Sequence, residues 1–311
     1  MKLAPVVIFT FNRLEHTKKM IEALKKNILA KDTEVFIFCD GPRNSEEALK
    51  VEKVKKYIKS IEGFKKINVI ESEKNKGLAK SVIDGVTNII NKYNKVVVLE
   101  DDLVTSSYFL TYMNEGLDLY ENRKDIWSLS GYGPNINMPI DYKEEIYITK
   151  RGSSWGWATW KDRWELIDWE VRCYTEFKKN KKERKKFNES GKDLSPMLDD
   201  QMEKRIDSWA IRWVYSQFKN DMWTIYPINS LVMNIGNDLS GTHTTTTTHF
   251  NVSLTEKNIN LKYNIKANND IIRNFKLFYD KNFSGYLAIF IKKIGLYKIM
   301  KKIRKKILIK L

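Results

Sequence analysis

The most informative part of the sequence is Lys95-Val96-Val97-Val98-Leu99-Glu100-Asp101-Asp102, because an apolar run leads directly into three carboxylates. Such a run is typical of a strand buried in a parallel sheet. In open α/β sheets, ligands bind in the crevice beyond the carboxyl ends of the strands. Clustered acids there can hold a hard divalent cation against a substrate's phosphates. The alternative is a solvated acidic turn or helix cap, although Ser106 further on is a candidate for the cap.

The first 130 residues alternate short apolar runs with amphipathic ones, the pattern of repeated βα units. The predicted strands are Pro5–Thr10, Glu34–Cys39, Ile67–Glu71, Lys95–Leu99 and Ile126–Ser130. The predicted helices between them are Leu14–Lys26, Ser45–Ile61, Leu78–Lys92 and Tyr108–Glu121. We expect an α/β fold with 1–130 as one half of a domain, 131–250 as its other half, and 251–311 as a carboxyl-terminal extension.

Polar residues follow the first three predicted strands, and we expect their loops to share one edge of the sheet. Arg13 follows the first strand and could meet a base or phosphates. Asp40 follows the second and could bind a base or ribose, although an aspartate before Gly-Pro is often only a turn residue. Lys80 lies in the opening turn of a predicted helix, where free amides and a lysine favour phosphate.

Within the acid triplet, Asp102 lies furthest into the loop and is the candidate for direct contact with a metal. Glu100 and Asp101 are placed for sugar or ribose hydroxyls. Oxygen ligands of this kind suit Mn2+ or Mg2+, which would take one or two carboxylates together with phosphate oxygens and water. His243 is a candidate further ligand, the alternative being a solvent-exposed histidine.

Seven of the nine tryptophans fall between Arg151 and Trp213, where the alternation of strands and helices is expected to stop. Glycine lets a ligand approach the backbone, and an indole offers a flat face to a sugar, so Trp155, Gly156 and Trp157 are candidate ligand contacts. Core packing is the alternative, and we expect only one or two of the three tryptophans in 151–160 at a site.

Asp207 lies at a predicted helix start among aromatic residues, where it is either a general base or a helix cap. Asp199 and Asp200 are rivals for the role of base, but they lie in a more hydrophilic run. A strand is also predicted at Trp223–Tyr226.

The net charge is +16, and nine Lys or Arg with no acid lie between Ile291 and Leu311. The pattern in 285–311 predicts two short basic amphipathic helices, which favour an anionic bilayer surface. Packing of their apolar stripes on the rest of the chain is the alternative. The two cysteines form no disulfide or metal framework, and no signal peptide or membrane span is evident. We expect a cytoplasmic protein, peripheral at the inner face of the cell membrane.

The order of several motifs resembles the bacterial sugar transferases of the glycosyltransferase-A fold, family 2-like and close to the N-acetylglucosaminyltransferase I type. The resemblance runs from Pro5 to about His243. Its motifs are Phe9-Thr10-Phe11-Asn12-Arg13, Cys39-Asp40-Gly41, Val98-Leu99-Glu100-Asp101-Asp102-Leu103, Ser154-Trp155-Gly156-Trp157-Ala158-Thr159-Trp160, Ile206-Asp207-Ser208-Trp209, Tyr226-Pro227, Asn234-Ile235-Gly236 and Ser240-Gly241-Thr242-His243.

The resemblance implies a Rossmann-like nucleotide-binding sheet with helices on both faces, followed by an acceptor-side region. It implies an inverting, metal-dependent transfer from a nucleotide-diphosphate sugar, with uridine as the default nucleotide, to a glycan or lipid-linked saccharide of a bacterial surface polysaccharide. In such enzymes the strand-end acids bind the donor's metal, an aspartate in the position of Asp207 is the base, and a loop like Asn237–Thr242 closes over the nucleotide. Thr10, Asn12, Ser240 and Gly241 are the further donor-site residues that it implies. The acid triplet departs from a strict Asp-x-Asp.

Other classes fit the sequence less well. A nucleotidyltransferase that makes sugar nucleotides or a dinucleotide-dependent dehydrogenase needs a glycine-rich loop after the first strand, where Phe11-Asn12-Arg13 stands instead. A nucleic-acid-binding protein would spread its basic residues along one groove, whereas here they gather in the tail and in Lys178–Lys186, which is expected to be a solvated helix face or loop. We expect no nucleic-acid partner.

Overall fold

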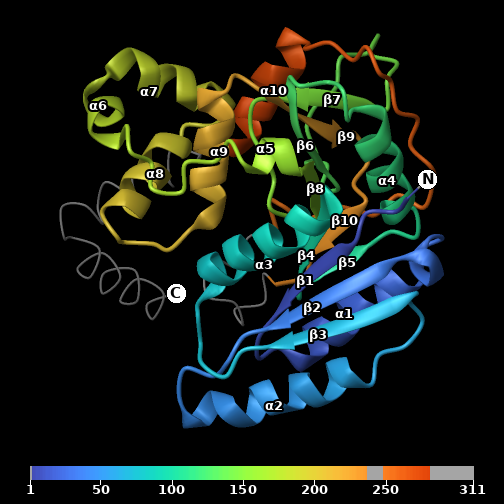
Figure 1. The fold of residues 1–311 in the computed structure, drawn as a ribbon. Helices are drawn as coiled ribbons and strands as arrows, with labels where there is room; N and C mark the ends of the chain where they lie inside the picture. The colour runs from blue at the N-terminus through green and yellow to red at the C-terminus, as the bar shows by residue number, and fades with distance from the viewer. Residues whose placement is uncertain (1, 237–247, 281–311) are drawn as a thin grey trace, which may run out of the picture.

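A mixed eight-stranded sheet organises the computed structural model, which describes residues 2–236 and 248–280. The strand order is β3-β2-β1-β4-β8-β6-β9-β7 (Figure 1). In chain order these strands are β1 (Val6–Thr10), β2 (Glu34–Cys39), β3 (Lys66–Glu71), β4 (Lys95–Glu100), β6 (Ile126–Ser130), β7 (Ile146–Thr149), β8 (Trp157–Trp160) and β9 (Trp223–Pro227). The α/β fold expected from the sequence is confirmed.

The first four strands are parallel, and their register aligns their carboxyl ends. Thr10 pairs with Cys39, Cys39 pairs with Glu71, and Phe9 pairs with Glu100. The loops that follow these strands therefore lie along one edge of the sheet, as the sequence predicts. Beyond β4 the sheet becomes mixed, because β8 runs antiparallel to both β4 and β6.

Helices cover both faces, because successive strand residues point to opposite sides. Val6 and Ile8 of β1 belong to the core under α1, α2 and α4, whereas Val7 and Phe9 belong to the core under α3 and α9. The helices are α1 (Leu14–Lys25), α2 (Ser45–Lys59), α3 (Leu78–Tyr93), α4 (Phe109–Leu119), α5 (Lys161–Trp164), α6 (Tyr174–Lys179), α7 (Lys181–Phe187), α8 (Leu194–Met202), α9 (Trp209–Lys219) and α10 (Asn269–Tyr279), with 3-10 turns at Ala30–Asp32 and Asn188–Ser190.

A two-stranded ribbon positions the chain after the acid triplet. β5 (Leu103–Thr105) pairs antiparallel with β10 (Val232–Asn234), and the amide of Ile235 donates to the carbonyl oxygen of Asp102. This pairing brings residues 127 to 131 positions apart in the sequence beside the end of β4.

The alternation of strands and helices stops after Arg151 as expected, since α5 to α9 follow one another without a strand between them. The strand β8 within the Trp-rich segment was not predicted. Its four residues are all buried, so no polar alternation marks it as a strand. Lys178–Lys186 is the solvated helical face that its charges predict, since it falls within α6 and α7 with its lysines exposed.

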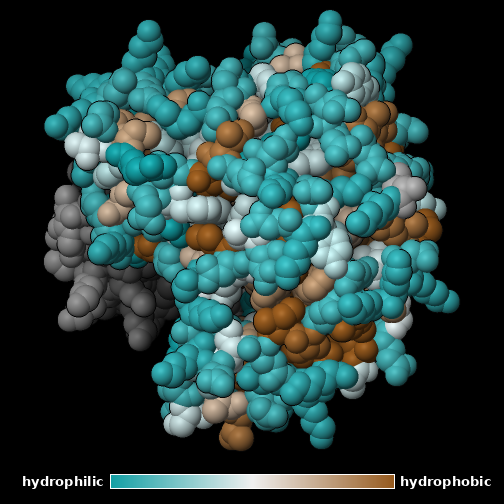
Figure 2. Space-filling model, viewed as in Figure 1, coloured by the Kyte–Doolittle hydropathy of each residue, from teal (hydrophilic) through white to brown (hydrophobic). Residues whose placement is uncertain are grey.

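The surface is mostly hydrophilic on the face shown in Figure 2, where apolar side chains gather over β2 and β3. Edge strand β3 has only partly buried residues between its exposed ends. No helix in the described ranges is long and apolar enough to span a lipid bilayer. The two helices predicted within 285–311 lie outside the described residues.

Candidate functional site

Arg13 and two carboxylates form an ion-pair cluster where β1 and β4 end. The Arg13 guanidinium donates to both oxygens of Asp101 and, over 2.9 Å, to Oδ2 of Asp102. Only 6% of the Asp101 side chain and 13% of the Asp102 side chain are exposed. The acids are therefore not a solvated turn, and Arg13 is engaged by them rather than open to a ligand.

Negative charge exceeds positive charge in this cluster. Burial, and then repulsion from Asp102 and Asp101, raises the pKa of Glu100 above that of an ordinary glutamate. Burial also raises the pKa of Asp101 to about 6, while Arg13 opposes that shift. A pKa of about 8 leaves Glu100 protonated at neutral pH. The carboxylates of Asp101 and Asp102 then still outnumber the one guanidinium of Arg13, which favours the arrival of a further cation.

Asp102 is the carboxylate placed to meet such a cation. Its Oδ2 accepts from Arg13, and Oδ1 has no hydrogen bond in the described part of the chain. A Cβ added at Gly236 would lie 2.3 Å from Oδ2, so glycine allows the chain after β10 to pass close to the carboxylate. Within 2–236 and 248–280, no group of three or more His, Cys, Asp or Glu could hold a metal ion. A cation here would have to take most of its ligands from substrate and water, as Mg2+ commonly does.

Asp40 joins two loops through hydrogen bonds, an arrangement we call the Asp40 clamp, and its carboxylate is not free to bind a ligand. Its carboxylate accepts hydrogen bonds of 2.9–3.1 Å from the backbone amides of Gly41, Lys76 and Gly77. Asp40 was predicted to bind a base or ribose. In the structure its buried carboxylate instead accepts hydrogen bonds from three backbone amides. The bonds tie the loop after β2 to the loop before α3.

Three other predicted donor-site residues also have partners within the protein. The Thr10 hydroxyl donates to the carbonyl oxygen of Phe38, Asn12 lies 3.5 Å from Glu47, and Lys80 pairs with Asp84 at an exposed position on α3. Thr10 thus stabilises the pairing of β1 with β2. Ser240, Gly241 and His243 lie outside the described residues.

Of the three candidate ligand contacts Trp155, Gly156 and Trp157, Trp155 lines a cavity and the other two do not. Trp157 is fully buried, with its ring 4.6 Å from Trp213 and 5.3 Å from Trp209, so its assignment to a ligand site is wrong. Gly156 is also buried at φ +63°, and a Cβ there would lie 2.7 Å from Val232. Glycine is needed at this position because a side chain would clash with the packed core. The prediction that Gly156 lets a ligand approach the backbone is therefore wrong.

Asp207 is not the cap of α9. Ser208 takes that position, since its side chain accepts from the amide of Ile211. Asp207 is 68% exposed, lies 3.7 Å from Arg212, and would lie 3.8 Å from a Cβ placed on Gly77. The carboxylate therefore lies beside the loop that Asp40 clamps.

The rival aspartates are held by arginines. Arg184 forms a two-bond fork with Asp199, and Arg205 pairs with Asp200. Asp207 is thus the least engaged of the three carboxylates.

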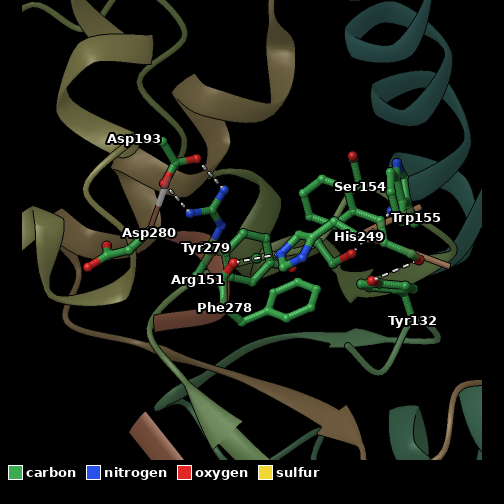
Figure 3. A pocket seen from close by; sticks show the side chains of 12 residues that line it. Tyr132, Arg151, Ser154, Trp155, Asp193, His249, Phe278, Tyr279 and Asp280 are labelled. Atoms are coloured by element: carbon green, nitrogen blue, oxygen red, sulfur yellow. Dashed lines mark hydrogen bonds and ion pairs between the residues drawn. The ribbon is translucent and has the colours of Figure 1, made fainter. Parts of the chain in front are cut away.

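A cavity of about 470 Å³ lies beside Trp155, and its lining comes from segments far apart in the sequence (Figure 3). Its aromatic and charged walls include residues that sequence analysis does not single out for a site: Tyr132, Asp193, His249, Phe250, Phe278, Tyr279 and Asp280. No short motif joins these positions, so only the fold brings them together.

The family described as Glycosyl transferase family 2 matches residues 6–191. No curated protein matches the chain. Among solved structures, the mannosyltransferase PcManGT from Pyrobaculum calidifontis, in complex with GDP-Man and Mn2+, is 10% identical with a TM-score of 0.34, over 51% of this chain and 45% of that one. S. aureus TarS 1–349 is 12% identical with a TM-score of 0.38, and the match covers 73% of this chain and 60% of that one.

The glycosyltransferase GlyE of Streptococcus pneumoniae TIGR4 is 13% identical with a TM-score of 0.36, over 71% of this chain and 45% of that one. This chain thus spans 45% to 60% of the length of these three solved chains. Likenesses this distant carry no argument about substrate or metal.

The clamp predicts a stability defect for Asp40→Asn. The amide keeps one acceptor oxygen and loses the other, so the buried N–H groups of the two loops lose bonding. We expect the free energy of unfolding to fall by about 1–3 kcal/mol in chemical denaturation. Asp84→Asn is the control, because exposed Asp84 pairs with Lys80, and its change should stay within about 0.5 kcal/mol. Equal stability of Asp40→Asn and the unsubstituted protein would contradict the clamp.

Proposed function

The chain belongs to glycosyl transferase family 2, and on that premise we propose that it transfers a sugar from a nucleotide-diphosphate donor, with uridine as the nucleotide, to a saccharide acceptor. Its mixed sheet with helices on both faces is the glycosyltransferase-A fold. The observation that carries the proposal is the acid cluster at the end of β4, on the sheet edge where the loops of β1, β2 and β3 also lie. We propose a relationship to the N-acetylglucosaminyltransferase I type on the order of the motifs alone.

Asp102 is the residue that would hold the donor's Mn2+ or Mg2+. The fit rests on its Oδ1, which accepts no hydrogen bond from the described residues, and on the two aspartates that share the single guanidinium of Arg13. A divalent ion bound there would neutralise negative charge that develops on the departing diphosphate. Arg13 keeps the two acids together beside the end of β1, and it orients Asp102 through Oδ2.

Asp207 is our candidate for the general base of an inverting transfer. As the acceptor oxygen attacks the anomeric carbon from the far face, the new C–O bond forms and the bond to the diphosphate breaks. The acceptor's proton passes to the Asp207 carboxylate, and the nucleoside diphosphate leaves with the bonding electrons. Support comes from the exposure of Asp207, its freedom from a capping role and its place beside the Gly77 loop.

We further propose that the acceptor is a glycan or lipid-linked saccharide of a bacterial surface polysaccharide or lipopolysaccharide, and that the protein acts at the inner face of the membrane. The support is the basic composition of 291–311, with nine Lys or Arg and no acid.

Asp102→Ala is expected to weaken metal-dependent donor binding. In a thermal-shift titration with UDP-sugars and Mn2+, the unsubstituted protein gains stability because the ligands bind the native state, by about 2.7 kcal/mol at 100 times Kd. The variant should lose most of that gain. Asp118→Ala is the control, since that carboxylate pairs with Lys95 at the other end of β4. An unchanged Mn2+-dependent shift in Asp102→Ala would exclude this assignment.

Asp207→Asn is expected to lower transfer by about 10²–10⁴-fold while leaving donor binding intact, because the amide cannot accept the proton. Product formation is measured by mass spectrometry, and donor binding by the same thermal-shift titration. Asp200→Asn is the control. Transfer at an undiminished rate by Asp207→Asn would refute the base assignment.

The membrane proposal predicts that the full chain is retained on anionic liposomes at low salt and released as salt rises, because salt screens lysine–lipid attraction. It should not be retained on duplex DNA. Co-sedimentation measures both. Retention on DNA, or on neutral liposomes to the same degree, would contradict the proposal.

A further inference from the structure

The cavity beside Trp155 opens at the same edge of the sheet as the acid cluster. β4 and β6 both run antiparallel to β8, so the carboxyl ends of β4 and β6 and the amino end of β8 share this edge. Tyr132 lies two residues after β6, and Trp155 lies two residues before β8. A molecule in this cavity is therefore on the strand-end side of the sheet, where Asp102 also lies.

One side of the cavity consists of aromatic rings at right angles to one another. The centroid of the Trp155 ring lies 4.8 Å from that of Tyr132 and 5.7 Å from that of Phe250. The ring centroids of Phe250 and Phe278 are 5.6 Å apart. The indole N–H of half-buried Trp155 has no hydrogen-bond partner among the described residues. Flat apolar faces with a donor at their rim suit the C–H face and hydroxyls of a pyranose.

The opposite side carries a buried ion pair (Figure 3). Arg151 and Asp193 form a fork of two bonds, each 2.8 Å long, and the ring of Tyr279 lies 3.9 Å from the guanidinium. Such a pair offers both remaining N–H donors and carboxylate lone pairs, which match neighbouring hydroxyl groups on a sugar.

The charges lining the cavity are compensated. Asp193 is neutralised by Arg151, and Asp280 pairs with Lys276 over 2.8 Å. Among the described residues that line the cavity, an anionic sugar or a phosphate would find no unpaired Lys or Arg. A lipid chain would strip water from the ion pair without replacing its hydrogen bonds. The volume of about 470 Å³ lies within the range of small-molecule sites.

We propose that this cavity is a subsite that binds one uncharged sugar unit of the acceptor, stacked on Trp155 and Phe278 and hydrogen-bonded to the Arg151–Asp193 pair. The proposal rests on the proposed function and names the chemistry of the acceptor. It makes Trp155 and Phe278 determinants of acceptor affinity, with no part in donor binding.

Saturation-transfer NMR on the full chain tests this subsite. The probes are methyl β-D-glucopyranoside, methyl β-D-galactopyranoside and, as the charged contrast, methyl β-D-glucuronide, each with and without UDP and Mn2+. At least one uncharged glycoside should bind more tightly than the glucuronide. Trp155→Leu and Phe278→Leu should each weaken that binding about fivefold, because each removes one aromatic face.

Leu277→Ala is the matched control, because Leu277 neighbours Phe278 on α10 but is 61% exposed. Its glycoside binding should equal that of the unsubstituted protein. UDP with Mn2+ should raise the melting temperature of all variants equally. Absence of glycoside binding, or binding that both pocket variants retain in full, would overturn the subsite. If UDP with Mn2+ does not raise the melting temperature of the unsubstituted protein, the proposed donor is overturned instead. Glycoside binding measured without UDP would then still test the subsite.

Discussion

The ion pairs of Arg13 with Asp101 and Asp102 are the interaction on which the site depends. The parallel pairing of β1 with β4 brings an arginine and two carboxylates to one point, where little of any of the three side chains is exposed. Without the guanidinium, neighbouring buried carboxylates would repel one another and lose hydration, a cost that favours protonation or unfolding. With it, the acids stay together at the strand end, and the loops after β1 and β4 are joined.

The neighbouring loops are held in a similar way, by a carboxylate that bonds to backbone rather than to solvent. Asp40 joins the loop after β2 to the start of α3, and Asp207 lies against the same glycine. The edge of the sheet thus carries one acid that organises the loops and another that is exposed. Asp40 and Asp207 are both aspartates at the end of a strand or the start of a helix. Asp40 is buried and bonded to backbone amides, whereas Asp207 is exposed, and this difference gives them different roles.

The tryptophan-rich segment has a comparable division. Trp157 lies among Trp164, Trp209 and Trp213 and packs α9 onto the sheet, whereas Trp155, two residues earlier, lines the cavity. Side chains two apart on a strand point to the same face, but β8 begins only at Trp157 and the chain turns at Gly156, where φ is +63°. The spacing of the indoles in the sequence does not reveal this turn, so the sequence predicts the same role, ligand contact, for Trp155 and Trp157.

Local composition was enough to predict the parallel half of the fold and the position of the acid cluster. Runs such as Val96–Leu99 are apolar on both faces and end in charge, and that pattern depends only on local composition. The three- and four-residue strands β5, β7, β8 and β10 carry too few residues for any period to show. Tertiary structure alone decided that Arg13 meets the acids, that amides occupy Asp40, and that α10 closes a cavity with Trp155. Each of these depends on contacts between distant residues, and such contacts arise only from strand register and packing.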